Sequence, residues 1–188
     1  LVMSTTTMAG MPEHFIVITL NHKKLSLKDL PDFSFEPDEL DLFMLHAASH
    51  PAIEEIAGLC TCNRTEFFAS VRSVKDAAHA IVHDIAQHAG ISLEDMRESL
   101  DVIVDASAVE HLFKLVAGLE SMIIGDAQIL GQVKQAYQHA GELGTCGRVF
   151  NQVFQRAFSV AKRIRRETGL GKGRLSINAK KGVMFSQF

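Results

Sequence analysis

Short apolar runs rich in β-branched or aromatic residues recur along the chain and predict strands. They are residues 15–20, 56–59, 66–71 and 102–104, each too short for a buried helix. A polar turn separates the second run from the third, which favours a hairpin. Residues 1–14 show no periodicity and are expected to be disordered.

Apolar residues recur at helical spacing between these runs. One amphipathic helix is predicted from Pro37, because proline suits the first helical turn, and Pro51 ends it. A longer helix is predicted from its capping residue Ser73 to Gly90. A short helix is predicted to begin at Ser92.

The remainder of the chain predicts three more helices. Ser107 and Glu110 have the spacing of a capping box for the first of them. Asp126 is a candidate cap for the second, in which Gly131 suggests that another backbone comes close. The third carries a long apolar stripe over residues 149–164.

This order of elements predicts an α+β fold: a small, mostly antiparallel sheet with helices on one face, joined to a helical lobe. We divide the chain into a disordered N-terminus (1–14), an α/β lobe with a cysteine turn (15–104), a helical lobe (105–168) and a linker or tail (169–188). The glycines of residues 169–173 follow a helix rather than a strand. We therefore interpret them as a helix cap and linker, not as a dinucleotide-binding loop.

The 188 residues are 47% hydrophobic, as in ordinary globular proteins. No apolar run approaches the ~18 residues that a membrane span requires, and residues 1–14 do not resemble a signal peptide. We therefore expect a soluble, cytoplasmic protein without membrane contact. The cysteines number three, which fits no paired framework, so reduced thiols are expected.

The charge is distributed unevenly. Within an overall net charge of −3, residues 148–188 hold ten Lys or Arg against Glu167 alone, a local charge of +9, so the other residues sum to −12. A basic end of this kind suits a phosphate backbone and agrees with an RNA partner. A solvated helix face followed by a frayed tail explains the charge equally well.

The polar turn of residues 60–66, with the sequence CTCNRTE, holds the candidate chemistry. Cys62 lies two residues from Arg64, and a nearby cation favours the thiolate over the thiol. A turn also leaves the sulfur open to a substrate. The alternative is that Cys62 is a small apolar filler, as most cysteines near strand ends are.

No metal site is expected. Cys60 and Cys62 are separated by one residue, fewer than in the usual zinc pair. His79 and His83 are one helical turn apart, but no third ligand accompanies them, so we interpret them as surface histidines.

Three segments resemble a known family. Thr61–Glu66, with the sequence TCNRTE, resembles the active-site turn of glutamyl-tRNA reductase. His111–Lys134 resembles a second motif of that family, H…GLDSxxxGEPQILGQVK, and Leu20–Lys23 more weakly resembles a third, LNHK. The resemblance spans residues 15–177 and corresponds to the family's N-terminal catalytic part. The family's nucleotide-binding and dimerisation parts have no counterpart in this sequence.

The resemblance implies an NADPH-dependent oxidoreductase that reduces glutamyl-tRNA to glutamate-1-semialdehyde for tetrapyrrole (porphyrin) biosynthesis. In that reaction a cysteine thiolate forms a glutamyl thioester, which hydride from NADPH then reduces. Carried over by position, the catalytic residues are Cys62, the nucleophile, and His111, which orients the substrate or moves a proton. The implied substrate-binding residues are Thr61, Asn63, Arg64, Ser121, Asp126, Ala127, Gln128 and Gln132.

Glutamyl-tRNA is thus the implied partner, with the aminomutase that follows in the pathway as a second candidate. NADPH belongs to the full-length family. We expect this chain to bind no cofactor, and by itself to form the thioester and hydrolyse it slowly.

The chain departs from the family pattern at two places. Asp126-Ala127 stands where the family has Glu-Pro, and Cys60 stands where it commonly has serine. Two other interpretations stay open: a non-catalytic reductase-like module that binds tRNA or a reductase subunit, and an inert fragment with the correct fold.

Overall fold

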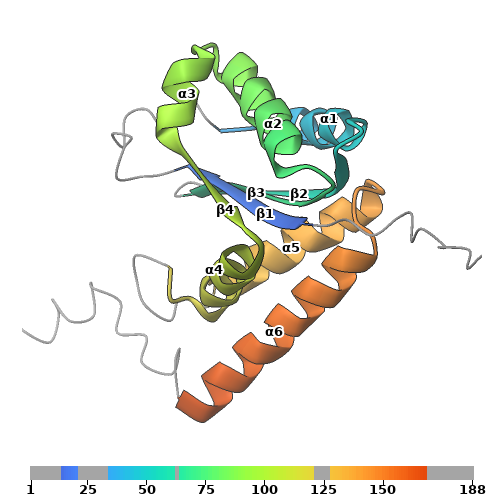
Figure 1. The fold of residues 1–188 in the computed structure, drawn as a ribbon. Coiled ribbons are helices and arrows are strands. Elements are labelled where there is room, and N and C mark those ends of the chain that lie inside the picture. Colours follow the sequence, from blue (N-terminus) through green and yellow to red (C-terminus); the bar gives the residue numbers. More distant parts are fainter. Residues whose placement is uncertain (1–13, 21–33, 62–63, 121–127, 169–188) are drawn as a thin grey trace, which may run out of the picture.

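In the part of the chain that the structure describes, four strands form one antiparallel sheet in the order β2-β3-β1-β4 (Figure 1). The strands are β1 (His14–Leu20), β2 (Ile53–Thr61), β3 (Arg64–Val71) and β4 (Leu100–Val104). The predicted strands and the predicted hairpin are confirmed, and each strand is longer than its apolar run.

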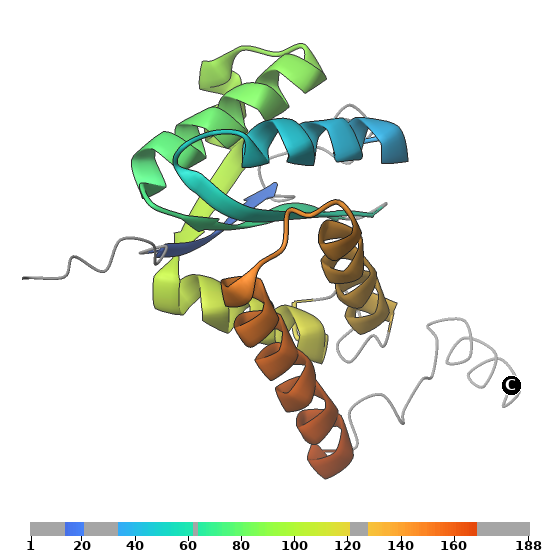
Figure 2. The same cartoon turned by 90° about the vertical axis from the view of Figure 1, so that its right-hand side faces the viewer.

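The computed structural model describes residues 14–20, 34–61, 64–120 and 128–168. Within these ranges, three helices cover one face of the sheet: α1 (Pro37–Ala48), α2 (Val74–Ala89) and α3 (Leu93–Ser99). Three more cover the other face: α4 (Asp105–Ala117), α5 (Gln128–Glu142) and α6 (Arg148–Thr168) (Figure 2). The predicted α+β class is confirmed, and the helical lobe packs directly on the second sheet face.

The sheet has two buried faces because its strands are apolar at successive positions. On β1, Ile16 and Ile18 pack in the core beneath α1 and α2. Phe15 and Val17 alternate with them and pack against α4, α5 and α6. A short unbroken apolar run therefore marks a strand at the centre of a three-layer arrangement. No described helix is both long enough and apolar enough to cross a membrane.

Local capping signals set both boundaries of α2 and the start of α3. The Ser73 hydroxyl accepts the Asp76 N–H at the start of α2, and Gly90 ends that helix in the left-handed region at φ 68°. Ser92 caps α3 in the same manner, as its sequence predicts. The candidate cap Asp126 lies outside the described residues.

Two predictions for the helical lobe are wrong. Helix α4 begins at Asp105, so Ser107 and Glu110 do not form a capping box at its start. The Asp105 carboxylate instead accepts the backbone N–H of Phe15 at 3.1 Å, and this tertiary contact fixes the helix start earlier in the chain. Among the described residues outside the adjacent turns of α5, no atom lies within 4 Å of the position that a Cβ of Gly131 would take, so the predicted close backbone is not found there.

Candidate active site at the end of the β2–β3 hairpin

The hairpin brings the two sides of the cysteine turn together. Thr61 ends β2 and pairs in register with Arg64, the first residue of β3. Two residues, Cys62 and Asn63, connect them in the sequence, and both lie outside the described residues. Because the two strands pair as far as Thr61 and Arg64, the residues on either side of the connection are fixed relative to each other.

The other predicted site residues also lie partly inside and partly outside the described ranges. Ser121, Asp126 and Ala127 also lie outside the described residues. The structure places Thr61, Arg64, His111, Gln128 and Gln132.

A buried carboxylate joins two of these residues. The side chain of Glu66 on β3 is 0% exposed, and the Arg64 guanidinium donates to its Oε1. His111 of α4 contacts its Oε2 through Nε2 at 2.9 Å. The Thr19 hydroxyl of β1 donates to Oε1 at 3.3 Å. One carboxylate thus joins β1, β3 and α4 beside the cysteine turn, and the three residues Arg64, Glu66 and His111 are called here the Glu66 cluster.

The electrostatics of the cluster favour the carboxylate anion. Burial acts to raise the pKa of Glu66, but the hydrogen bond and charge of His111, followed by those of Arg64, hold the pKa below its ordinary value. A buried charge is tolerated when it is both paired and hydrogen-bonded. Arg64 and His111 are themselves 15% and 13% exposed, so they can reach a bound substrate from the edge of the core.

A separate cavity of about 370 Å³ lies between the end of β2 and α5. Thr61 and Gln132 both line it, so the structure brings these two predicted substrate-binding residues together. Gln135 and His139 extend the α5 wall, and His139 is bonded through Nε2 to Asp41 of α1. Gln128, the first residue of α5, is exposed and is not among the described residues that line this cavity.

The two described cysteines have weakly acidic thiols. Burial raises the pKa of Cys60 to about 12, although a hydrogen bond with Thr65 acts in the opposite direction. Burial and the negative charge of Glu55 raise the pKa of Cys146 to about 11. Since the thiolate is the nucleophilic form, neither environment activates sulfur. The assignment of Cys62 as the reactive thiol stays a prediction.

The histidine pair on α2 is exposed, as predicted. His79 accepts a hydrogen bond from Arg97 at 3.0 Å, and His83 contacts Asp84 at 3.3 Å. Within the described ranges, no group of three or more His, Cys, Asp or Glu side chains is arranged to hold a metal ion.

Glu66 is the site residue that the sequence analysis did not assign. Its sequence position, four residues after Cys62, suggested only proximity. The signal that could have found it is its place at the start of an apolar run, on a strand whose two neighbours, β1 and β2, are also apolar. A carboxylate in that setting is buried, and a buried carboxylate requires partners.

Comparisons with known proteins agree with the resemblance. Residues 18–168 match the family model described as "Glutamyl-tRNAGlu reductase, N-terminal domain". The chain is 40% identical over 158 residues to a protein of Alkalilimnicola ehrlichii named Glutamyl-tRNA reductase, and 37% identical over 163 residues to one of that name from Pelotomaculum thermopropionicum. The alignments cover 84% and 87% of this chain but only 35% and 37% of those relatives. The chain therefore spans little more than a third of their length.

A solved structure is also similar. The Glutamyl-tRNA Reductase from Methanopyrus kandleri superposes on this chain with a TM-score of 0.62 at 31% sequence identity. The similarity covers 81% of this chain and 34% of that one.

Proposed function

The chain belongs to the glutamyl-tRNA reductase family, whose N-terminal domain it matches, and we propose that it carries out the cysteine-dependent half of the family's reaction. The Cys62 thiolate attacks the ester carbonyl carbon of glutamyl-tRNA. An S–C bond forms, the C–O bond to the terminal ribose breaks, and the ribose oxygen takes up a proton, which leaves a glutamyl thioester on the protein. The observation that carries this proposal is the Glu66 cluster beside the connection that holds Cys62.

His111 is the proposed proton carrier: it takes the thiol proton of Cys62 and passes it to the departing ribose oxygen. It comes from α4, and its ring is fixed by the contact of Nε2 with Glu66 at 2.9 Å. A histidine held by a carboxylate in this manner can act as a general acid or base near neutral pH.

Arg64 is the proposed anchor for the substrate's side-chain carboxylate. A guanidinium has five N–H donors, and the described contacts use Nη1 for Glu66 and Nη2 for the carbonyl oxygen of Glu120. Donors therefore remain for a substrate carboxylate, and both contacts orient the planar group.

The cavity lined by Thr61 and Gln132 is the proposed site for the rest of the glutamyl group. Its volume of about 370 Å³ lies in the range of small-molecule sites. Asn63, Ser121, Asp126, Ala127 and Gln128 are proposed to complete the binding site on the strength of the family motifs alone.

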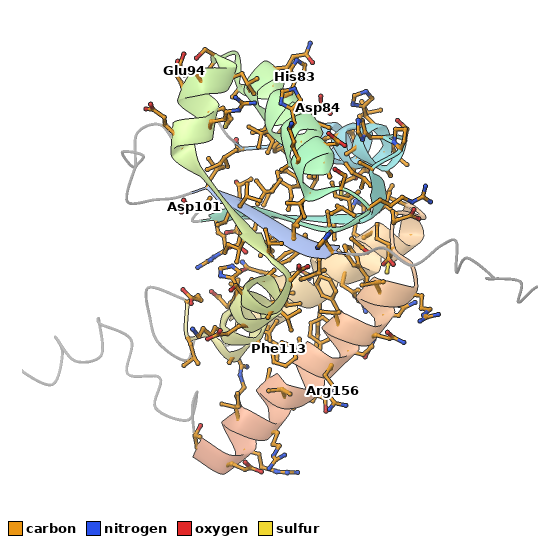
Figure 3. The ribbon with its side chains drawn as sticks, in the orientation of Figure 1. His83, Asp84, Glu94, Asp101, Phe113 and Arg156 are labelled. Carbon is orange, nitrogen blue, oxygen red and sulfur yellow. The ribbon has the colours of Figure 1, made fainter. Side chains whose placement is uncertain are left out.

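The outer side of α6 is proposed to contact the RNA backbone. Its described, exposed basic residues are Arg148, Arg156, Lys162, Arg163 and Arg166, while its inner side is buried in the core against α4 and the sheet. Arg156 and Phe113 of α4, both labelled in Figure 3, line one groove of about 430 Å³. Exposed cations along one helix suit a polyanion.

NADPH would supply the hydride in the family as a whole. The described residues do not fit that cofactor: their sheet is antiparallel, whereas a dinucleotide fold requires parallel strands joined through helices. We therefore propose that the described domain forms the thioester and that, where no nucleotide-binding domain supplies hydride, it releases glutamate to water as a weak esterase.

Incubation of the protein with tRNA charged with radiolabelled glutamate tests the proposal. We expect label on the protein after acid precipitation, slow release of free glutamate and no aldehyde, with or without NADPH. Cys62→Ser should abolish the protein label, and Cys60→Ser should keep it. Label that survives Cys62→Ser would contradict the nucleophile assignment. Binding of tRNA without any Cys62-dependent deacylation would favour a non-catalytic binding module.

A further inference from the structure

We infer that Glu66 is a positioning residue that fixes the tautomer of His111, keeping a proton on Nε2 so that Nδ1 is the nitrogen that serves the substrate. This inference rests on the proposed function and assigns a role to a residue to which the family resemblance above gave none. It follows from the kinds of hydrogen-bonding groups that contact the Glu66 carboxylate.

Glu66 can only accept hydrogen bonds. Its side chain is fully buried on β3, between β2 and β1, and the ion pair with Arg64 keeps it anionic. The Arg64 guanidinium and the Thr19 hydroxyl both direct donors at Oε1. The group 2.9 Å from Oε2 is Nε2 of His111. An acceptor-only oxygen at this distance requires that Nε2 carry hydrogen.

The charged side chains that contact the Glu66 carboxylate come from its own strand and from α4. Leu59 of β2 and Thr19 of β1 are its cross-strand neighbours, and neither titrates. Arg64 comes from its own strand and His111 from α4. Among the described residues, these two supply the ion-pair partners of Glu66. The anion therefore also stabilises the imidazolium that forms when Nδ1 takes a proton, as the buried carboxylate does in other carboxylate–histidine pairs.

Glu66→Gln reverses this arrangement without changing the size of the side chain. A glutamine amide offers one oxygen and one NH₂ group. Because Arg64 can only donate, the amide oxygen must face Arg64, and the NH₂ group must then face His111. Nε2 becomes an acceptor, and the proton of the neutral ring moves to Nδ1. The substrate-facing nitrogen then has no lone pair with which to take up the thiol proton.

The decisive measurement combines nitrogen NMR of the imidazole rings with single-turnover formation of the glutamyl-protein adduct. The chain has nine histidines, so comparison with His111→Asn identifies the His111 signals. We expect the Nε2–H tautomer in the wild type and the Nδ1–H tautomer in Glu66→Gln. Adduct formation should slow by roughly 10²–10⁴-fold, the usual contribution of general acid–base catalysis, with a loss of about 10⁴-fold when the buried carboxylate beside the histidine of a Ser-His-Asp triad becomes an amide, while tRNA affinity stays within about threefold.

Glu110→Gln is the matched control, since Glu110 precedes His111 on α4 but is exposed and paired with Lys114. It should leave both the tautomer and the rate unchanged. A wild-type His111 in the Nδ1–H form would overturn the inference, and that result does not depend on whether the variant folds. So would a slow Glu66→Gln protein whose His111 keeps the Nε2–H form. If the wild type forms no Cys62 adduct, the proposed function fails, and the wild-type tautomer still decides the role of Glu66.

Discussion

The carboxylate of Glu55 on β2 accepts a hydrogen bond at 2.8 Å from the backbone N–H of Phe150, in the first turn of α6. The same carboxylate accepts the N–H groups of Gly147 and Val149, each at 2.8 Å. The first N–H groups of a helix have no partners within the helix, and the positive end of its dipole favours an anion. Glu55 therefore caps α6 from a distant strand and fastens the edge of the sheet to the basic helix.

Glu55→Gln should lower the free energy of unfolding by about 2–3 kcal/mol. The substitution replaces charge-assisted bonds with weaker ones and turns an amide NH₂ group toward backbone donors. Urea denaturation followed by circular dichroism measures the difference. Glu54→Gln is the control, because Glu54 forms a surface ion pair with Arg72 and should change stability by no more than about 1 kcal/mol. Equal decreases in the two variants would contradict the capping role.

Two glycines on the helical side should respond oppositely to alanine. A Cβ at Gly147 would lie 3.1 Å from Cδ and Oε1 of Glu55, so Gly147→Ala should push the cap away and cost about 1–2 kcal/mol. Gly131 lies in α5 with open space at its Cβ position. Gly131→Ala should therefore raise the unfolding free energy by about 0.5–1 kcal/mol through helix propensity alone. Thermal unfolding of both variants checks the signs, and a stabilised Gly147→Ala protein would show that the Glu55 cap tolerates the added methyl group.

The elements of this fold are predictable because their signals are local. Ser73 and Gly90 bound α2 through contacts with residues a few positions away, so their spacing in the sequence suffices. The apolar runs predict strands for the same reason. The order and type of the elements follow from these signals without any knowledge of tertiary contacts.

Glu55 and Asp105 were beyond such reasoning because their partners are distant in the sequence, and Glu66 was beyond it because His111 lies 45 residues away. Glu55 binds a helix more than 90 residues away, and Asp105 binds β1 at a similar separation. In the sequence each carboxylate is an ordinary polar residue, and its partners come close to it only when the sheet and α4–α6 have packed together. The family motifs pointed to Arg64 and His111, but the residue that connects them required the structure.

Cys60 should be almost inert toward alkylation at pH 8. With its pKa raised to about 12 by burial, the thiolate fraction at pH 8 is about 10⁻⁴, whereas an ordinary exposed thiol of pKa ~8.5 is partly ionised. Brief treatment with iodoacetamide followed by peptide mass spectrometry should therefore label Cys62 first. Labelling of Cys60 should become appreciable only as the pH rises toward 12 or the protein unfolds. Cys60 labelled before Cys62 at pH 8 would contradict both the burial argument and the nucleophile assignment.

Charge on α6 should govern tRNA affinity. Replacing Lys162, Arg163 and Arg166 by Ala removes exposed cations from its outer side. The slope of log affinity against log salt should fall by up to about 2–3, close to one for each phosphate that is no longer neutralised. Filter binding across a salt series measures the slope. Replacing Lys75 and Arg97 on the opposite helical layer is the control and should leave the slope nearly unchanged. A slope that changes only in the control would place the RNA on the α2–α3 side.

The free energy of unfolding should decrease at acid pH because the Glu66 carboxylate becomes protonated. Burial would raise the pKa of this carboxyl, but His111 and then Arg64 lower it further than burial raises it, so its pKa is below the ordinary value in the folded protein. A carboxyl with a lowered folded-state pKa contributes stability in full above its unfolded-state pKa of about 4.3, and the contribution is lost as the pH falls through the folded-state value. Glu66→Gln cannot ionise and lacks the contribution at every pH. The difference in unfolding free energy between the wild type and Glu66→Gln should therefore shrink as the pH falls from about 5 to about 3, as measured by urea denaturation at each pH.

Glu110→Gln, at an exposed carboxyl on the same helix as His111, should show only a small difference throughout. A Glu66→Gln difference that grows toward acid pH would mean that Glu66 is not the anion that holds Arg64 and His111 in the native protein.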